Sequence, residues 1–161
     1  KSHFFELNLA KLLTEIGYEP LTFNKSDRPD MVLFPKKEEN DLENFLHNDE
    51  LKILVETTSA DILLLSKIEA DLENFKEHTT KVLKINAQRT LIVGESIAKN
   101  IPGQIQCLLK KFHPFTIITF ENLEYLKKKI NEKGDNSWEK VGKVLMHDGI
   151  VEKEFIDSIF V

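Results

Sequence analysis

The spacing of apolar residues predicts a helix at the start of the chain, over residues 4–16. The apolar side chains of this segment recur three and four positions apart and form one stripe: Phe5, Leu9, Leu12, Leu13 and Ile16. Gly17 then provides a helix stop, because glycine readily adopts the left-handed conformation found at helix ends. We therefore expect an amphipathic helix that covers one face of a core.

Short runs of aliphatic and β-branched residues predict strands farther along the chain. They cover residues 18–23, 30–34, 51–57, 89–94 and 115–120, with polar turn residues at 24–28. The segment 35–50 is charged and has no aliphatic stripe, so we expect it to be a surface excursion.

Helical patterns alternate with these strands. The longest covers residues 61–83, and its charged positions are predicted to face solvent: Lys67, Glu69, Asp71, Glu73 and Lys76. Further helices are predicted after Pro102-Gly103 as far as residue 112 and over 121–132, followed by a turn at 133–136. Two short closing helices are predicted over 137–145 and 153–159, on either side of Asp148-Gly149. This order predicts one α/β domain over residues 1–161, with a mixed central β-sheet flanked by helices. Because the chain begins at Lys1, we expect a domain excised from a larger protein or a processed product.

Composition narrows the possible functions. The single cysteine, Cys107, rules out an internal disulfide and suggests a reducing, cytoplasmic compartment. No apolar run approaches the ~20 residues that span a bilayer, so we expect no membrane partner. The net charge of −5 is unlike that of a general nucleic-acid coat protein, but it is compatible with an acidic metal site. The five histidines lack zinc-hydrolase spacing, and no glycine-rich phosphate loop occurs.

Two acidic residues carry the chemistry that the sequence suggests. Asp30 follows Pro29 at the start of one predicted strand, and Glu56 interrupts an otherwise apolar strand near its end. Side chains alternate along a strand, so Glu56 and Thr58 should share one face, while Thr57 should point into the core with Ile53 and Val55. If the two strands are neighbours, the carboxylates converge, and Mg²⁺ is the natural ion between them.

These residues, in this order, resemble the PD-(D/E)xK superfamily of restriction-endonuclease-like nucleases. The resemblance covers roughly residues 3–132 and follows the segments FFELNLAKLLTEIGY, RPDMVLF, ILVETTS, TLIVG and FTIITFENLEYLKKKI. The tail VGKVLMHDGIVEKEFIDSIF is also similar to the closing helices of type IIS restriction-enzyme cleavage domains. The resemblance implies a restriction-endonuclease-like fold and a metal-dependent endonuclease that acts on DNA.

Carried over by position, the resemblance implies a role for each matching residue. Asp30 and Glu56 would be the metal ligands, helped by the main-chain carbonyl of Thr57. Glu6 would be an accessory acid that holds a metal-bound water or a second ion. The cofactor would be Mg²⁺, with Mn²⁺ able to substitute, and the products would carry a 3′-hydroxyl and a 5′-phosphate.

The sequence departs from the family pattern at Thr58, where the superfamily usually has lysine. Threonine offers a hydroxyl but no positive charge. Three explanations are open: Thr58 positions the attacking water while the metal supplies the electrostatics; a lysine from elsewhere fills the role, with Lys67 the nearest candidate; or the site has lost its activity.

Three hypotheses follow. The first is a cleavage module whose specificity comes from a recognition domain, a partner subunit or a homodimer. The second is a catalytically degenerate nuclease fold that acts as a DNA-binding or protein-interaction scaffold. The third is an unrelated α/β domain, in which Asp30 and Glu56 would lie far apart.

Overall fold

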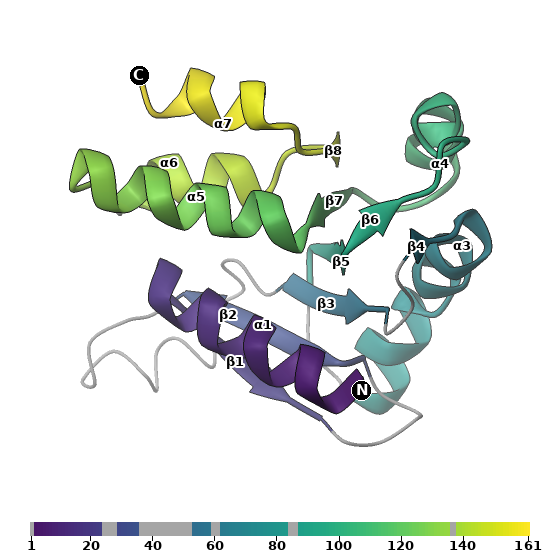
Figure 1. The fold of residues 1–161 in the computed structure, drawn as a ribbon. Coiled ribbons are helices and arrows are strands. Elements are labelled where there is room, and N and C mark those ends of the chain that lie inside the picture. The colour runs from purple at the N-terminus through teal and green to yellow at the C-terminus, as the bar shows by residue number, and fades with distance from the viewer. Residues whose placement is uncertain (1, 24–28, 36–52, 59–61, 84–86, 136–137) are drawn as a thin grey trace.

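The fold is described from a computed structural model, which places residues 2–23, 29–35, 53–58, 62–83, 87–135 and 138–161 (Figure 1). The turn predicted at 24–28 lies outside these residues, as does nearly all of the excursion predicted at 35–50. Within the described ranges, helices and strands alternate along the chain.

The N-terminal part forms a helix and the antiparallel half of a sheet. Helix α1 (Ser2–Ile16) ends at Gly17, whose φ of 115° is accessible to glycine but strained for other residues. Strand β1 (Tyr18–Thr22) pairs antiparallel with β2 (Met31–Pro35), which pairs antiparallel with β3 (Ile53–Thr57). The predicted helix and these strands are therefore confirmed.

The rest of the sheet is parallel. Strand β3 pairs with β5 (Arg89–Gly94), which is followed by β7 (Phe115–Thr119) and β8 (Gly149–Ile150), giving the order β1-β2-β3-β5-β7-β8. The predicted mixed sheet is confirmed. Strand β8 lies between the two predicted closing helices and was not predicted, because two residues are too few to show a strand period in the sequence.

The long helix predicted over 61–83 is wrong at its start, and its C-terminal end is a π-helix instead of an α-helix. Its start forms β4 (Ile62–Leu63), which pairs in parallel with β6 (Ser96–Ile97), so pairing between distant segments overrides the local helical pattern. Helix α3 follows (Leu65–Glu73), and the segment ends as a π-helix (Glu77–Val82). The other helices are a 3₁₀ turn (Pro102–Gln104), α4 (Ile105–Lys111), α5 (Phe120–Lys133), α6 (Trp138–Leu145) and α7 (Lys153–Ile159).

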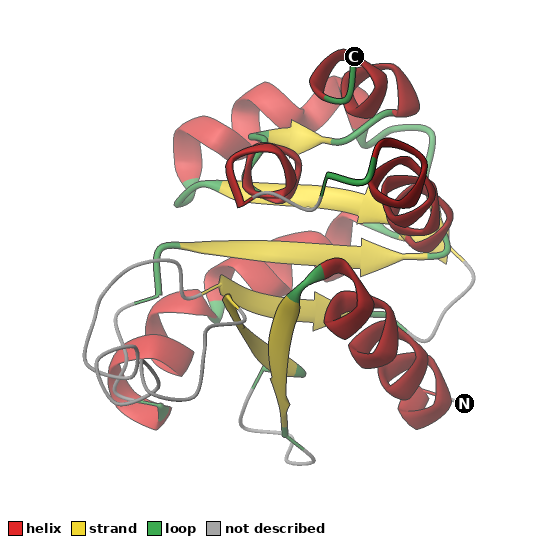
Figure 2. Ribbon diagram, turned by 90° about the vertical axis from the view of Figure 1, so that its left-hand side faces the viewer, coloured by secondary structure: helices red, strands yellow, loops and turns green. Residues whose placement is uncertain are grey.

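Helices cover both faces of the sheet (Figure 2). On one face, α1, α5, α6 and α7 enclose a core that includes Ile53 and Val55. On the other, α3 and α4 pack over Ile92, Phe115 and Ile117. A sheet buried on both faces favours continuous apolar strands, so a carboxylate inside one of them calls for an explanation. No helix of the described part is long and apolar enough to cross a membrane.

Candidate active site

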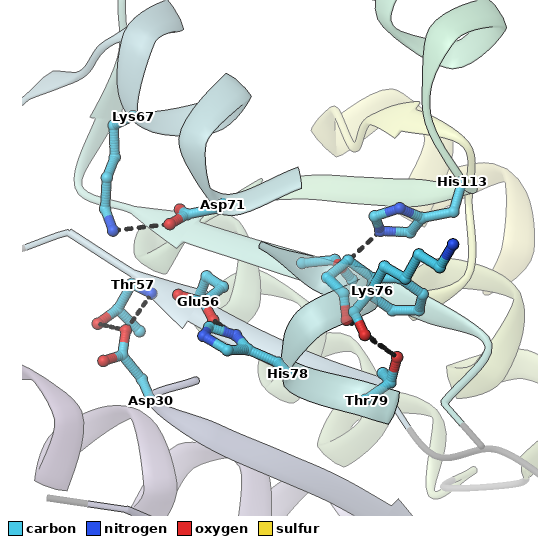
Figure 3. Close-up of polar contacts among 11 residues, drawn as sticks. Asp30, Glu56, Thr57, Lys67, Asp71, Lys76, His78, Thr79 and His113 are labelled. Carbon is cyan, nitrogen blue, oxygen red and sulfur yellow. Dashed lines mark hydrogen bonds and ion pairs between the residues drawn. The ribbon is translucent and has the colours of Figure 1, made fainter. Parts of the chain in front are cut away.

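Asp30 sits at the entry to β2 and is held by β3. The β2–β3 register pairs Met31 with Val55, and one further step places Asp30 opposite Glu56. The Asp30 Oδ2 atom accepts hydrogen bonds from the Thr57 backbone N–H at 2.6 Å and from Thr57 Oγ1 at 2.9 Å (Figure 3). Two segments that are well separated in the sequence therefore meet at these side chains.

This contact corrects the prediction for Thr57. Ile53 and Val55 do join the core, as expected, but the Thr57 hydroxyl is used by Asp30. The reason is position: Thr57 is the last residue of β3, at the rim of the sheet, where the Asp30 carboxylate can reach it. Two donors on Oδ2 fix the orientation of that carboxylate.

Glu56 lies in the buried part of the same strand and is only 6% exposed. Burial raises the pKa of Glu56, and the nearby charge of Asp30 raises it further, while His78 and Lys67 oppose this shift. Its Oε1 atom is buried and has no hydrogen-bond partner among the residues that the structure places. Such an arrangement is costly for an ionised carboxylate unless a proton donor or a cation approaches it.

Glu6 reaches the site from α1. It forms a hydrogen bond with Asp30 and is partly buried. Burial, this hydrogen bond and the charges of Asp30 and Glu56 raise the pKa of Glu6 to about 7. The accessory acid implied by the resemblance thus lies beside the predicted acidic pair.

Helix α3 adds a cation and another carboxylate from the opposite side. Lys67 Nζ lies 2.8 Å from Asp71 Oδ1, one helical turn away. Burial acts to lower the pKa of Lys67, but the hydrogen bond and charge of Asp71, with the charges of Glu56 and Asp30, raise it overall, so Lys67 is a cation. Burial and the charge of Glu56 raise the pKa of Asp71 to about 7.

The prediction that Asp71 faces solvent was therefore wrong, because its side chain is only 5% exposed. The Lys67 side chain is 39% exposed, and Glu73 and Lys76 are exposed as predicted. Asp71 lies three positions after the buried Ile68, and so on the inward stripe of the helix. That spacing was the sequence signal for a charged residue turned towards the sheet.

His78 extends the site from the π-helix, and sequence reasoning did not find it. Its Nδ1 atom lies 3.6 Å from Glu56 Oε1. Interaction with Glu56 raises the pKa of His78, although burial opposes the shift. A widened helical turn sets the direction of this ring, and no regular helical period reveals it.

Thr58, at the position of the family lysine, is also buried. Its methyl group packs towards the end of β5: a Cβ built on Gly94 would lie 3.4 Å from Thr58 Cγ2. Thr58 supplies no charge, so the cationic side chain of the site is Lys67, which comes from α3 instead of β3.

The donor atoms suit a hard divalent cation. Four carboxylates interact electrostatically here, from Glu6, Asp30, Glu56 and Asp71. Carboxylate oxygens are hard ligands of the kind that Mg²⁺ prefers. Across the described residues, no group of three or more His, Cys, Asp or Glu side chains is arranged to hold a metal ion. Mg²⁺ does not require such a group, because it is commonly held by one or two carboxylates and completes its shell with water.

Comparison with solved structures gives a clear fold neighbour. The chain matches restriction endonuclease FokI with a TM-score of 0.66 and 14% identity over 91% of this chain and 28% of that one. It matches FokI bound to DNA with a TM-score of 0.64 and 13% identity over 92% and 27%, respectively. The chain has a restriction-endonuclease-like fold. It spans less than a third of the length of these matched chains. Comparisons with protein-family models and with curated proteins find no match.

Proposed function

We propose that this chain is a metal-dependent endonuclease domain that hydrolyses DNA phosphodiester bonds. The observation that carries the proposal is the convergence of Asp30 and Glu56, opposed by the Lys67 cation, in a restriction-endonuclease-like fold. The third hypothesis, an unrelated domain with the two carboxylates far apart, is contradicted by the β2–β3 register.

Asp30 and Glu56 would hold Mg²⁺ or Mn²⁺, with the main-chain carbonyl of Thr57 as a further ligand. When bound, such a cation polarises the phosphodiester and lowers the pKa of a coordinated water. The two Thr57 donors on Asp30 Oδ2 orient this carboxylate for the cation. Glu6 would hold the nearby water through a hydrogen bond.

Lys67 takes the place of the usual motif lysine in this proposal. A Lys67 cation stabilises the charge that grows on the phosphate oxygens when water attacks phosphorus. Its contact with Asp71 sets the position of the ammonium group. The P–O3′ bond then breaks, water supplies the oxygen and the protons, and a 3′-hydroxyl and a 5′-phosphate are released. Thr58 packs beside Gly94 and contributes at most its hydroxyl.

The chain covers less than a third of the matched FokI chains, so we expect it to act together with further domains or subunits. One matched FokI structure is bound to DNA, which supports DNA as the substrate here. Specificity would come from a recognition domain, a partner subunit or a second copy of the chain, since one site per chain cuts one strand at a time. We place this activity in the cytoplasm, in line with the single cysteine.

Plasmid cleavage at low salt tests the proposal, with Mg²⁺, Mn²⁺ or EDTA in parallel reactions. Metal-dependent nicking or linearisation should be abolished by Asp30→Ala and by Glu56→Ala while the fold is kept. Glu73→Ala, which removes an exposed carboxylate of α3, is the matched control and should cut like the wild type.

Calorimetric titration with Mg²⁺ separates the remaining outcomes. A wild-type chain that neither cuts DNA nor binds Mg²⁺ would contradict the proposal. It would favour the degenerate scaffold, for which the uncharged Thr58 is the motivating observation. Mg²⁺ binding without cleavage would instead indicate a cleavage module that requires its partner.

A further inference from the structure

The contact between His78 and Glu56 is incomplete. His78 Nδ1 and Glu56 Oε1 lie 3.6 Å apart, slightly beyond hydrogen-bond distance (Figure 3). Both atoms are buried, and neither has a hydrogen-bond partner among the residues placed in the structure. A donor and an acceptor that face each other at this distance need only a small shift to form a hydrogen bond.

Another histidine of the same chain, His113, has a hydrogen-bond partner for a nitrogen of its partly buried ring. His113 Nε2 lies 2.7 Å from Thr90 Oγ1, and its ring stacks on Phe75 with 3.6 Å between ring centroids. Buried polar groups are normally satisfied in this way, because an unpaired buried donor or acceptor is unfavourable. The contrast makes the His78–Glu56 pair a feature that requires an explanation.

The π-helix determines where the His78 ring points. The backbone N–H of Leu83 donates to the His78 carbonyl over five residues, the hydrogen bond that defines a π-turn. The Thr79 hydroxyl donates towards the Phe75 and Lys76 carbonyls at 3.0 and 3.2 Å, which supports the widened turn. Single π-turns occur frequently at functional sites. This turn orients one imidazole towards the only carboxylate within β3.

We propose that His78 is a positioning residue for Glu56. It donates from Nδ1 to Glu56 Oε1 and leaves the other carboxylate oxygen to bind the divalent cation. This inference rests on the proposed function, because it assigns Glu56 as a metal ligand. Partners of metal ligands orient the ligand, and their loss typically weakens metal binding 10–100-fold.

Calorimetric titration of the full chain with Mn²⁺ tests the role of the Nδ1 atom. His78→Ala removes the ring, and His78→Gln carries its amide nitrogen to the Nε2 position. His78→Asn keeps a donor close to the Nδ1 position. We expect Mn²⁺ affinity to fall about 10–100-fold in the Ala and Gln variants and to be largely restored in the Asn variant.

His113→Gln is the control, since that ring contacts Phe75 and Thr90 and no site carboxylate. It should bind Mn²⁺ like the wild type. Thermal unfolding in EDTA identifies any variant that fails to fold, and comparison of the Asn and Gln variants tests the inference even if the Ala variant does not fold.

The outcomes separate this inference from the proposed function. If all three His78 variants bind Mn²⁺ like the wild type while Glu56→Ala does not bind it, the inference is wrong and the metal site stands. If His78→Asn is as weak as His78→Gln, the role is packing and the inference is also wrong. If the wild type binds no Mn²⁺, the proposed function itself fails.

Discussion

Asp71→Asn should stabilise the metal-free chain, and by more as the pH rises. Asp71 is 5% exposed, and burial together with the charge of Glu56 raises its pKa from 3.8 to about 7. A carboxyl group whose pKa is raised in the folded state favours folding while it is protonated. That contribution is complete below about pH 4 and is lost as the pH rises towards 7. The amide of Asn has no charge to lose, so the two proteins should diverge over this range.

The size of the effect follows from the shift. A rise from 3.8 to about 7, at about 1.4 kcal/mol per unit, corresponds to on the order of 4 kcal/mol at pH 8. This shift already includes the opposing hydrogen bond and charge of Lys67, so the loss of that contact is not subtracted again. We expect a net gain of about 4 kcal/mol at pH 8, or roughly 8–16 °C in Tm for a domain of this size.

Thermal and urea unfolding in EDTA between pH 4.5 and 8.5 measure this effect. Glu73→Gln removes an exposed carboxylate from the same helix and should show no pH-dependent difference from the wild type. A gain from Asp71→Asn that is the same at pH 5 and pH 8, or a loss at pH 8, would refute the electrostatic reasoning. It would show that Asp71 is held there by its hydrogen bond with Lys67.

Further predictions concern the cation, the lysine and a buried histidine. Mg²⁺ at 100 times its Kd should raise the free energy of unfolding by about 2.7 kcal/mol, and Glu56→Ala should abolish the gain in the same unfolding assay. Lys67→Ala should lower the plasmid cleavage rate about 10²–10³-fold, whereas Thr58→Ala should lower it less than tenfold; equal losses would contradict the assignment of Lys67. Burial, with the charge of Arg89, lowers the pKa of His113 from 6.5 to about 4, so the free energy of unfolding should decrease as the pH falls from 6.5 to 4. His113→Gln should make the decrease measured by acid unfolding smaller, and an unchanged acid unfolding profile would contradict this role of His113.

The apolar pattern was sufficient to predict the sheet and most helices. Strand β5 (Arg89–Gly94) and helix α7 (Lys153–Ile159) begin and end where the sequence placed them, because buried strands and amphipathic helices leave strong periodic patterns. The acidic pair could be located because Asp30 follows proline and Glu56 interrupts an apolar strand. The predictions that were wrong concern elements whose structure depends on contacts between distant segments. The pairing of β4 with β6 is one such case.

The α3 side of the site was harder to predict for the same reason. Lys67 was named only as the nearest lysine, and Asp71 and His78 were not proposed as site residues. A charged residue on a helix is usually solvated, and only the packing of α3 against the sheet turns Asp71 inwards. The direction of His78 depends on a π-turn, which has no signature in the hydrophobic period.

The sheet changes direction at β3, and the candidate site lies on that boundary. Asp30 precedes β2 on the antiparallel side, whereas Lys67 and His78 follow β3 towards the parallel side. We expect the β1–β2 pair to open as a local unit, and to carry Asp30 away from Glu56, more readily than β5 and β7 separate. A cation bound between Asp30 and Glu56 would link the hairpin to the rest of the sheet. Amide hydrogen exchange should then slow with Mg²⁺ in β1 and β2 more than in β7. Cation binding would in this way couple the local stability of the two antiparallel strands to that of the parallel part of the sheet.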